Sequence, residues 1–407
     1  VTATIGLGAT YCWLRRFQTG MWRWSVAGAL LFGLGLYAKI LMLWLIAALV
    51  GAVLLLNLRS LIKERQDWFK RMRQVVYPEG LLVTIAFVVG CWPLLIYNLQ
   101  TGGTLISIGE NTTTSYYGIN NLAVGSNLLT RLNQLVTLLD GGHLWYLGQI
   151  YRNPFPVILF SLNLLVVIVI ILRKSWRQDP ATFAPHKIAL FPVLVILLVM
   201  IASVGTVSAL WITHFAILMP WPALSLATGI WFISLARRTF RWSPTGPIWV
   251  AIILLVLSNL GAVVRYHQAL TASGGLSTHS DAVYRLSRWL QTNATGQHVI
   301  AMDWGLAAPV TYLTNGQVNT VEVFGYRWQA DLQLTDRLQT FIAQPNTLYL
   351  WRAPDEIIFD RSGQFKALYQ PQNLEETIVE AFYERSGRPL LGVTRLVDKG
   401  TATNPPQ

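Results

Sequence analysis

The feature that most constrains this chain is a long apolar stretch near its start, residues 25–58. It reads SVAGALLFGLGLYAKILMLWLIAALVGAVLLLNL, and Lys39 is its one charged side chain. A single helix of this length would be about 51 Å long, whereas the hydrocarbon core of a bilayer is about 30 Å thick. The stretch therefore predicts two short helices that turn near Gly33–Lys39.

Basic residues flank this stretch on both sides. They are Arg15, Arg16 and Arg23 before it, and Arg59, Lys63 and Arg65 after it. Positive charge marks the cytoplasmic ends of membrane helices. Two crossings place both flanks in the cytoplasm and put Lys39 at the outer face of the membrane. There its ammonium either meets a lipid phosphate or snorkels to the headgroups and anchors a helix end.

Composition places the chain among polytopic membrane proteins. Of its 407 residues, 53% are hydrophobic and 12% are charged, and the mean hydropathy is +0.44. Residues 265–407 hold 12 Lys/Arg against 13 Asp/Glu, a net charge of −1. Because the whole chain has a net charge of +12, residues 1–264 have a net charge of +13. The basic pI thus reflects the membrane region and indicates no nucleic-acid partner. The two cysteines, Cys12 and Cys91, offer neither a disulfide framework nor a zinc spacing.

Residues 101–155 form a long polar loop between two apolar segments. Its basic residues are Arg131 and Arg152, and so few positive charges predict that the loop lies outside. A Gly/Thr/Asn-rich part precedes a helix whose apolar positions recur at helical spacing. These positions are Leu128, Leu132, Leu135 and Leu139. We expect this amphipathic helix to lie along the outer interface, held by Trp145 and Tyr146.

Region 1–264 is predicted to form about eight transmembrane helices, one of them partial. Besides the first hairpin, the expected spans are 1–14, Gly80–Leu99 with a break at Pro93, Pro156–Leu172, Ile188–Ala202, His214–Leu235 and Pro247–Val264. The connecting segments assigned to the cytoplasm carry 16 Lys/Arg, including those at 173–187 and 237–241. The outer segments before residue 265 carry two besides Lys39, which supports this topology.

From Arg265 onward the composition is that of a soluble domain, and alternating patterns predict a small α/β domain over 265–397. Helices are expected at Ser280–Thr292, Ala307–Leu313, Asp331–Ala343 and Leu374–Arg385, and strands at Gln297–Met302, Val318–Phe324, Thr347–Trp351 and Leu391–Leu396. Counting crossings places this domain outside, and 398–407 is expected to be a disordered tail. The predicted fold class is mainly α: a polytopic transmembrane helical bundle followed by a small extracytoplasmic α/β domain.

Four short motifs resemble the membrane glycosyltransferases of the GT-C superfamily. They are GLGLYAK at 33–39, CWPLLIYNLQTGG at 91–103, HFAILMP at 214–220, and Asp303-Trp304-Gly305 after the first strand of the α/β domain. The likeness is to bacterial relatives of protein O-mannosyltransferases and of the lipid A aminoarabinose transferase. It implies a multi-pass enzyme of the bacterial cytoplasmic membrane, which transfers a sugar from a polyprenyl-phosphate donor to a lipid, glycan or protein acceptor at the outer face.

The resemblance also implies a catalytic carboxylate that this chain does not supply. In the family that residue lies in the first outer loop, which we expect upstream of Val1, so no base is assigned and the chain alone is expected to be inactive. Sugar transfer needs a carboxylate to deprotonate the acceptor. It also needs cations, or a divalent metal such as Mg²⁺ or Mn²⁺, to stabilise the departing phosphate.

Three basic residues, Lys39, His214 and Arg131, are the candidates for binding the donor phosphate. His214 is expected to open a helix at the membrane surface, where the N-terminus favours anions. A capping or interface histidine is the alternative. Arg131 lies on the polar side of the amphipathic helix, where a solvated surface arginine is the alternative.

Four outer-loop residues are candidates for substrate contacts. They are Glu110, Tyr116, Tyr117 and Asp140. The acids could bind a sugar hydroxyl or a metal, and the tyrosines could close over a donor. Ordinary loop acids and interface tyrosines are the alternatives. Asp303 lies at the carboxyl end of a predicted strand, where ligands bind in open sheets, or else in a buried turn with a packed Trp304 indole.

A non-catalytic transport or envelope-assembly protein is the alternative function. Transporters commonly show repeated halves and charged residues at the membrane midplane. This sequence shows no obvious internal repeat and no such charges, which favours the transferase. An assembly protein that keeps only the scaffold stays open as an interpretation.

Overall fold

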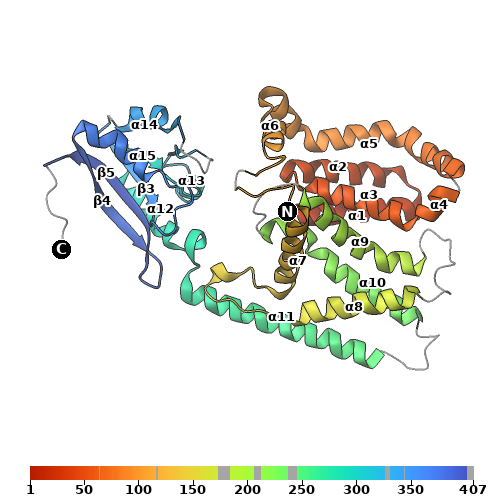
Figure 1. Cartoon of the computed structure of the whole chain (residues 1–407). Helices are drawn as coiled ribbons and strands as arrows, with labels where there is room; N and C mark the ends of the chain where they lie inside the picture. Colours follow the sequence, from red (N-terminus) through yellow and green to blue (C-terminus); the bar gives the residue numbers. More distant parts are fainter. Residues whose placement is uncertain are drawn as a thin grey trace. The chain divides into compact units, whose positions relative to one another are not determined.

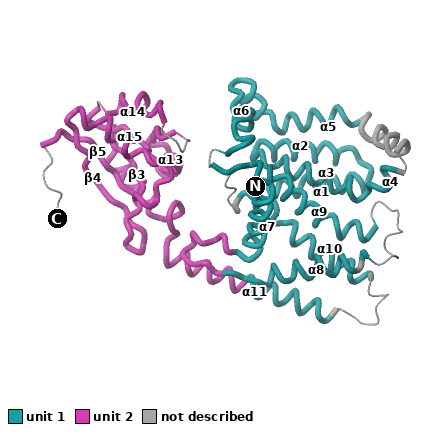
Figure 2. Tube along the Cα trace, in the orientation of Figure 1, with its two compact units in different colours: residues 1–141, 152–259 teal, residues 142–151, 260–407 magenta. Residues whose placement is uncertain are grey.

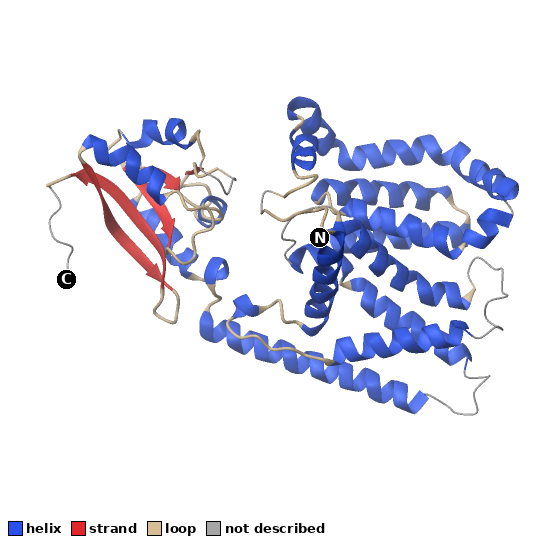
Figure 3. Ribbon diagram, viewed as in Figure 1, coloured by secondary structure: helices blue, strands red, loops and turns tan. Residues whose placement is uncertain are grey.

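The computed structural model describes residues 1–63, 65–115, 118–172, 184–205, 212–236, 245–325, 331–342 and 344–400. The chain divides into two compact units (Figure 2): unit 1 is residues 1–141 with 152–259, and unit 2 is residues 142–151 with 260–407. Unit 1 is helical, whereas unit 2 contains a five-stranded sheet flanked by helices (Figure 3). The predicted mainly helical fold with a small α/β domain is thereby confirmed at this level.

Unit 1 is built from helices, most of which lie side by side along one direction, while α7 runs across them (Figure 1). They are α1 (Thr2–Thr19), α2 (Trp22–Ala38), α3 (Met42–Leu56), α4 (Leu58–Lys63), α5 (Arg65–Thr101), α6 (Gly103–Glu110), α7 (Val124–Asp140), α8 (Phe155–Leu172), α9 (Pro185–Val204), the 3₁₀ helix η3 (Ile212–Leu218), α10 (Pro220–Ala236) and the first part of α11 (Thr245–Ser273). α7 is the amphipathic helix predicted from its leucine spacing. α11 runs across the predicted domain boundary at residue 264 without interruption.

The apolar stretch 25–58 folds as two helices, as its length predicted, but the turn comes later than predicted because residues 33–38 are still part of α2. α2 and α3 are separated by the three-residue turn Lys39–Leu41. The N–H of Lys39 donates to the Gly35 carbonyl at 3.0 Å, and the Lys39 carbonyl accepts from the Met42 N–H at 3.0 Å. These two bonds satisfy backbone groups that the helix ends would otherwise leave without partners.

Contacts with other helices hold the end of unit 1 at which this hairpin begins and ends. Arg16 at the end of α1 holds Glu79 of α5 with two bonds, Nη2 to Oε1 at 2.9 Å and Nε to Oε2 at 3.2 Å. Lys187 at the start of α9 donates to Asn57, just past the end of α3, at 3.1 Å. The turn between α2 and α3 therefore lies at the opposite end of unit 1 from these contacts (Figure 1), as a helical hairpin requires. Most of the basic segments predicted at 173–187 and 237–241 fall outside the described residues.

Four helical segments in the described part of the chain are long and apolar enough to cross a membrane. They are Glu79–Thr101, Pro185–Val204, His214–Leu235 and Gly246–Ser273. Met42–Leu56 and Phe155–Val169 are apolar but shorter. A 15-residue helix is about 23 Å long, less than the hydrocarbon thickness of about 30 Å. Length and composition therefore support membrane association through four helices, and the larger predicted number stays a prediction.

Pro93 does not break α5, contrary to the prediction that the span is interrupted there. α2 packs against this helix with almost no space between the backbones. A Cβ atom on Gly33 would lie 2.9 Å from the Gly90 Cα and would collide with the Phe87 carbonyl, and one on Gly90 would collide with the Leu30 carbonyl. Small residues commonly permit this close approach of membrane helices.

Unit 2 contains the mixed sheet β2-β1-β3-β5-β4. Its elements are η1 (Trp145–Leu147), the end of α11, η5 (Ser277–His279), α12 (Ala282–Asn293), β1 (His298–Ala301), α13 (Ala307–Leu313), β2 (Thr320–Glu322), α14 (Leu334–Ile342), β3 (Thr347–Arg352), α15 (Ser362–Tyr369), η6 (Gln370–Gln372), β4 (Leu374–Tyr383) and β5 (Pro389–Asp398). β1 is parallel to β2 and β3, whereas β5 is antiparallel to β3 and β4. Most of the predicted elements are confirmed, and residues 401–407 of the expected tail lie outside the described residues.

Helices cover both faces of this sheet. Successive side chains of each central strand point to opposite faces, so both faces are apolar and pack against helices. Val299 of β1 packs in one buried cluster with Leu286 of α12. The next residue, Ile300, belongs to a second buried cluster with Leu338 of α14 and Phe365 of α15. The two clusters make unit 2 a three-layer α/β domain.

The prediction of a helix over Leu374–Arg385 was wrong. The segment LEETIVEAFY contains three Glu, a helix-forming residue, which favoured a helix locally. It forms β4 instead, and pairs with β5 from Leu374↔Asp398 to Tyr383↔Pro389. Gly387, with φ of 86°, lies in the tight turn between the two strands. Pairing with a neighbouring strand therefore outweighed local helix propensity.

Candidate functional site

Arg131 of α7 is buried in unit 1, with 4% of its surface exposed. Its Nη1 donates to Gln134 Oε1 at 3.1 Å and its Nη2 to the Ser203 carbonyl at 3.4 Å. Its guanidinium carbon lies 5.9 Å from the centre of the Phe215 ring. Burial lowers the pKa of Arg131, since a less polar surrounding disfavours the charged form. The alternative of a solvated surface arginine is therefore wrong.

Asn127 helps to hold α7 against the C-terminus of α9. It precedes Arg131 by one turn, so both side chains lie on one face of α7. Asn127 Nδ2 donates to the Val204 carbonyl at 3.3 Å and to the Asn120 carbonyl at 3.0 Å. With the bond from Arg131 to Ser203, two side chains of α7 satisfy carbonyls at the C-terminus of α9. Sequence analysis missed Asn127, although its spacing of four from Arg131 was the available signal.

His214 does not open an α-helix, contrary to prediction. It lies inside the 3₁₀ helix η3, and α10 begins at Pro220. Proline is favoured at the first position of a helix, which accounts for the later start. His214 is half-buried, and the next residue, Phe215, is buried against the Arg131 guanidinium. The structure thus brings Arg131 to the segment that carries His214.

Lys39 is exposed in the turn between α2 and α3. Met42, at the start of α3, is fully buried in the same hydrophobic cluster as Leu138 of α7 and Phe215 of η3. The Lys39 turn, α7 and η3 are therefore packed around one core at this end of unit 1. Among the residues that the structure describes, no carboxylate forms an ion pair with Lys39.

The predicted substrate-loop residues are less well connected to this core. Glu110 is exposed at the end of α6. Asp140 ends α7, nine residues after Arg131, which corresponds to about 14 Å along a helix. Its carbonyl accepts from the Asn153 N–H at 2.8 Å. Tyr116 and Tyr117 lie outside the described residues.

In unit 2, Asp303 belongs to a buried turn, which confirms the structural alternative for Asp303 but not for Trp304. Its fully buried carboxylate accepts from the backbone N–H groups of Ile358 and Phe359, each at 2.9 Å. Arg352 Nε lies 3.4 Å from the same carboxylate and also donates to the Trp304 carbonyl. These partners give the Asp303 carboxylate a structural role in this turn. The Trp304 indole is 45% exposed and not packed as predicted.

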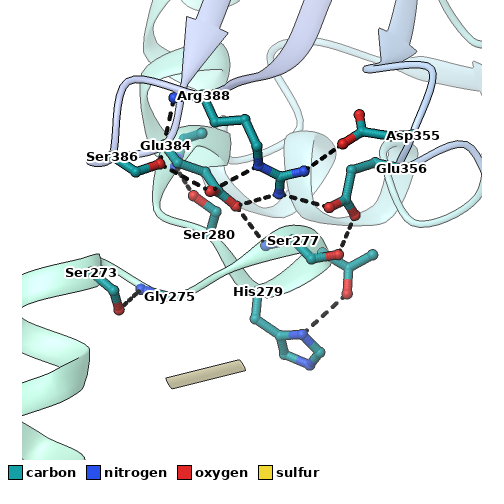
Figure 4. Close-up of polar contacts among 12 residues, drawn as sticks. Ser273, Gly275, Ser277, His279, Ser280, Asp355, Glu356, Glu384, Ser386 and Arg388 are labelled. Carbon is teal, nitrogen blue, oxygen red and sulfur yellow. Dashed lines mark hydrogen bonds and ion pairs between the residues drawn. The ribbon is translucent and has the colours of Figure 1, made fainter. Parts of the chain in front are cut away.

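A second polar cluster in unit 2 surrounds Arg388 (Figure 4) and was not predicted. Its guanidinium pairs with Asp355 at 2.9 Å, Glu356 at 2.6 Å and Glu384 at 2.8 Å. Ser277 of η5 donates its N–H to Glu384 at 2.8 Å and its hydroxyl to Glu356. Hydrogen bonds from Arg388 lower the pKa of Glu384 and outweigh the effect of burial. The cluster joins three loops, and the Arg388 guanidinium is paired with three carboxylates.

His279 lies beside this cluster and stacks on Tyr146, with ring centres 4.2 Å apart and 20° between the planes. Trp145 meets the His279 ring edge-on at 6.4 Å. Burial, and then the charge of Arg352, lower the pKa of His279. The two aromatic residues expected to anchor the amphipathic helix therefore pack against η5 within unit 2.

Among the described residues, no three His, Cys, Asp or Glu side chains gather as metal ligands. We therefore assign no metal-binding residues. Comparisons of the chain with known protein families, with curated proteins and with solved structures find no match. The resemblance to GT-C glycosyltransferases thus rests on the short motifs quoted above.

Proposed function

We propose that the chain is a membrane glycosyltransferase whose helical unit binds a polyprenyl-phosphate sugar and transfers the sugar to a lipid, glycan or protein at the outer face. The observation that carries this proposal is the packing of Arg131 against the His214–Phe215 segment, at the end of unit 1 that also holds the Lys39 turn. In this proposal that end faces outward, the basic loops face the cytoplasm, and the α/β domain is extracytoplasmic.

A polyprenyl phosphate has two chemically different parts, which suit this end of the unit. Its apolar chain fits between lipid-facing helices, and its phosphate needs cations at the membrane surface. The exposed ammonium of Lys39 provides a point charge. His214 provides an imidazole donor next to a buried aromatic ring. Arg131 holds η3 in place and adds positive potential to the same region.

These cations would stabilise the negative charge that develops on the phosphate as the sugar leaves. Glu110, Asp140, Tyr116 and Tyr117 remain proposed contacts for the sugar or the acceptor. Asp140 lies about 14 Å along α7 from Arg131, and Tyr116 and Tyr117 lie outside the described residues, so we assign no catalytic base. Donor binding is therefore the property of this chain to test.

We expect Lys39→Gln to weaken binding of a polyprenyl-phosphate sugar about tenfold, because one charge-assisted contact with the phosphate is lost. His214→Gln should weaken it in the same direction. The measurement is equilibrium binding of a fluorescent short-chain donor to the full chain in lipid nanodiscs. Lys187→Gln removes a lysine at the other end of unit 1 and should leave the affinity unchanged.

Equal affinities of the Lys39→Gln and Lys187→Gln variants would remove Lys39 from the site. If the unaltered chain bound no donor, the glycosyltransferase proposal itself would fail. A transport or assembly protein would then be the better interpretation.

A further inference from the structure

A groove in unit 2 lies between the last turns of α11 and the segment 148–151. It encloses about 420 Å³ and is lined by Arg265, Gln268 and Ala272 from the helix and by Gln149 and Tyr151 from the segment. The three helix residues follow one another at spacings of three and four and so share one face of α11. The groove is therefore a helix face with a second wall beside it.

Several contacts fix that second wall against α11. Ser273 donates its hydroxyl to the Leu147 carbonyl at 2.9 Å. The Tyr266 hydroxyl accepts from the Tyr151 N–H at 3.2 Å and donates to the Tyr151 carbonyl. A Cβ on Gly148 would lie only 2.6 Å from the Ser273 hydroxyl oxygen, so the segment lies directly on the helix. The groove is thus part of the folded unit.

Arg265 gives this groove a positive charge. Its guanidinium lies 4.6 Å from the centre of the Tyr151 ring, and the residue is exposed. None of the described carboxylates forms an ion pair with it, and α11 contains no Asp or Glu. A guanidinium can donate two parallel hydrogen bonds to a phosphate. The amides of Gln149 and Gln268 offer further donors.

An apolar groove continues along the neighbouring face of α11. It is shallow and largely open, has a volume of about 500 Å³, includes Val263 and Val264, and shares Gln268 and Ala272 with the first groove. The apolar span of α11 begins at Gly246. Arg265 is 19 residues further along, which corresponds to about 29 Å of helix. That length matches the hydrocarbon thickness of about 30 Å, so Arg265 reaches the depth of lipid phosphates.

We propose that this groove binds one anionic phospholipid. The phosphate sits on Arg265, the headgroup hydroxyls meet Gln149 and Gln268, and an acyl chain lies along Val263 and Val264. An anionic headgroup is favoured over a choline or ethanolamine headgroup because α11 offers no acidic side chain to an ammonium. The site uses none of the residues assigned to the sugar donor.

Native mass spectrometry of the full chain, released from detergent after addition of phosphatidylglycerol or phosphatidylcholine, tests this proposal. We expect the unaltered chain to retain one phosphatidylglycerol in preference to phosphatidylcholine. Arg265→Gln should weaken that binding about tenfold. Arg395→Gln, which removes an exposed arginine of β5, is the matched control and should retain the lipid. Val264→Gln, in the apolar groove, should also weaken retention.

Equal retention of the two lipids by the unaltered chain would overturn the proposal without reference to any variant. Equal loss of phosphatidylglycerol from the Arg265→Gln and Arg395→Gln variants would overturn it too, since net charge alone would then explain binding. Displacement of the lipid by millimolar inorganic phosphate would show that the apolar groove contributes nothing, and would likewise contradict a lipid site.

Discussion

Asp303→Ala is expected to destabilise unit 2 by about 3–5 kcal/mol, the usual cost of removing one partner from a buried ion pair. The substitution leaves the buried Arg352 guanidinium without its carboxylate and takes the acceptor from the N–H groups of Ile358 and Phe359. Domains are commonly stable by about 5–15 kcal/mol, so most of the stability of unit 2 is at risk.

Hydrogen exchange of the full chain measures this loss segment by segment. Peptides from β1 and β3 should lose protection in the Asp303→Ala variant, while peptides from α9 should keep theirs. Asp355→Ala is the matched control because that carboxylate pairs with Arg388 at an exposed position, where such pairs contribute about 1 kcal/mol or less. Similar protection in the two variants would refute the assigned role of Asp303.

Gly33→Val should prevent correct packing of unit 1. A side chain at this position would collide with the Phe87 carbonyl and press on the Gly90 Cα, and both are backbone atoms of a long helix. Overpacking of a core by side chains typically costs about 1–3 kcal/mol, and backbone atoms yield less readily than side chains. We expect little monodisperse protein on size-exclusion chromatography in detergent, and a lowered Tm for what remains.

Gly261→Val provides the control for this prediction. Gly261 also lies in an apolar helix, but an added Cβ would meet no atom within 4 Å. The control should therefore elute and melt like the unaltered chain. Normal elution and Tm of the Gly33→Val variant would contradict the close α2–α5 contact. Within the GLGLYAK motif, Gly33 thus has a packing role, whereas Lys39 is the residue proposed to bind the donor phosphate.

Features that depend on nearby residues could be predicted from the sequence. The length of the stretch 25–58 predicted its hairpin, and the bounds of α13 agree with the predicted helix at Ala307–Leu313. The segment that forms β4 shows the limit of such signals, because its local helix propensity was overruled by pairing with β5. α15 was missed altogether.

Features that depend on distant residues could not be predicted. The sequence marks Arg131 only as a polar position on an amphipathic helix, but the side chain is buried and donates to the carbonyl of Ser203, which is 72 residues away. The sequence around Glu79 predicts an acidic residue at the end of a loop, but Glu79 forms an ion pair with Arg16, which is 63 residues away. The cluster around Arg388 likewise joins residues from separate loops, and no local pattern marks them as neighbours.

Photocrosslinking tests the proposed donor site most directly. A short-chain polyprenyl phosphate with a photoreactive group beside the phosphate would be bound to the full chain in nanodiscs, and the adducts mapped by peptide mass spectrometry. We expect adducts in the Lys39–Leu41 turn, around Arg131 and in η3, and competition by polyprenyl phosphate but not by the uncharged prenol. Adducts concentrated instead around Arg16 and Lys187, at the other end of unit 1, would contradict the proposed site.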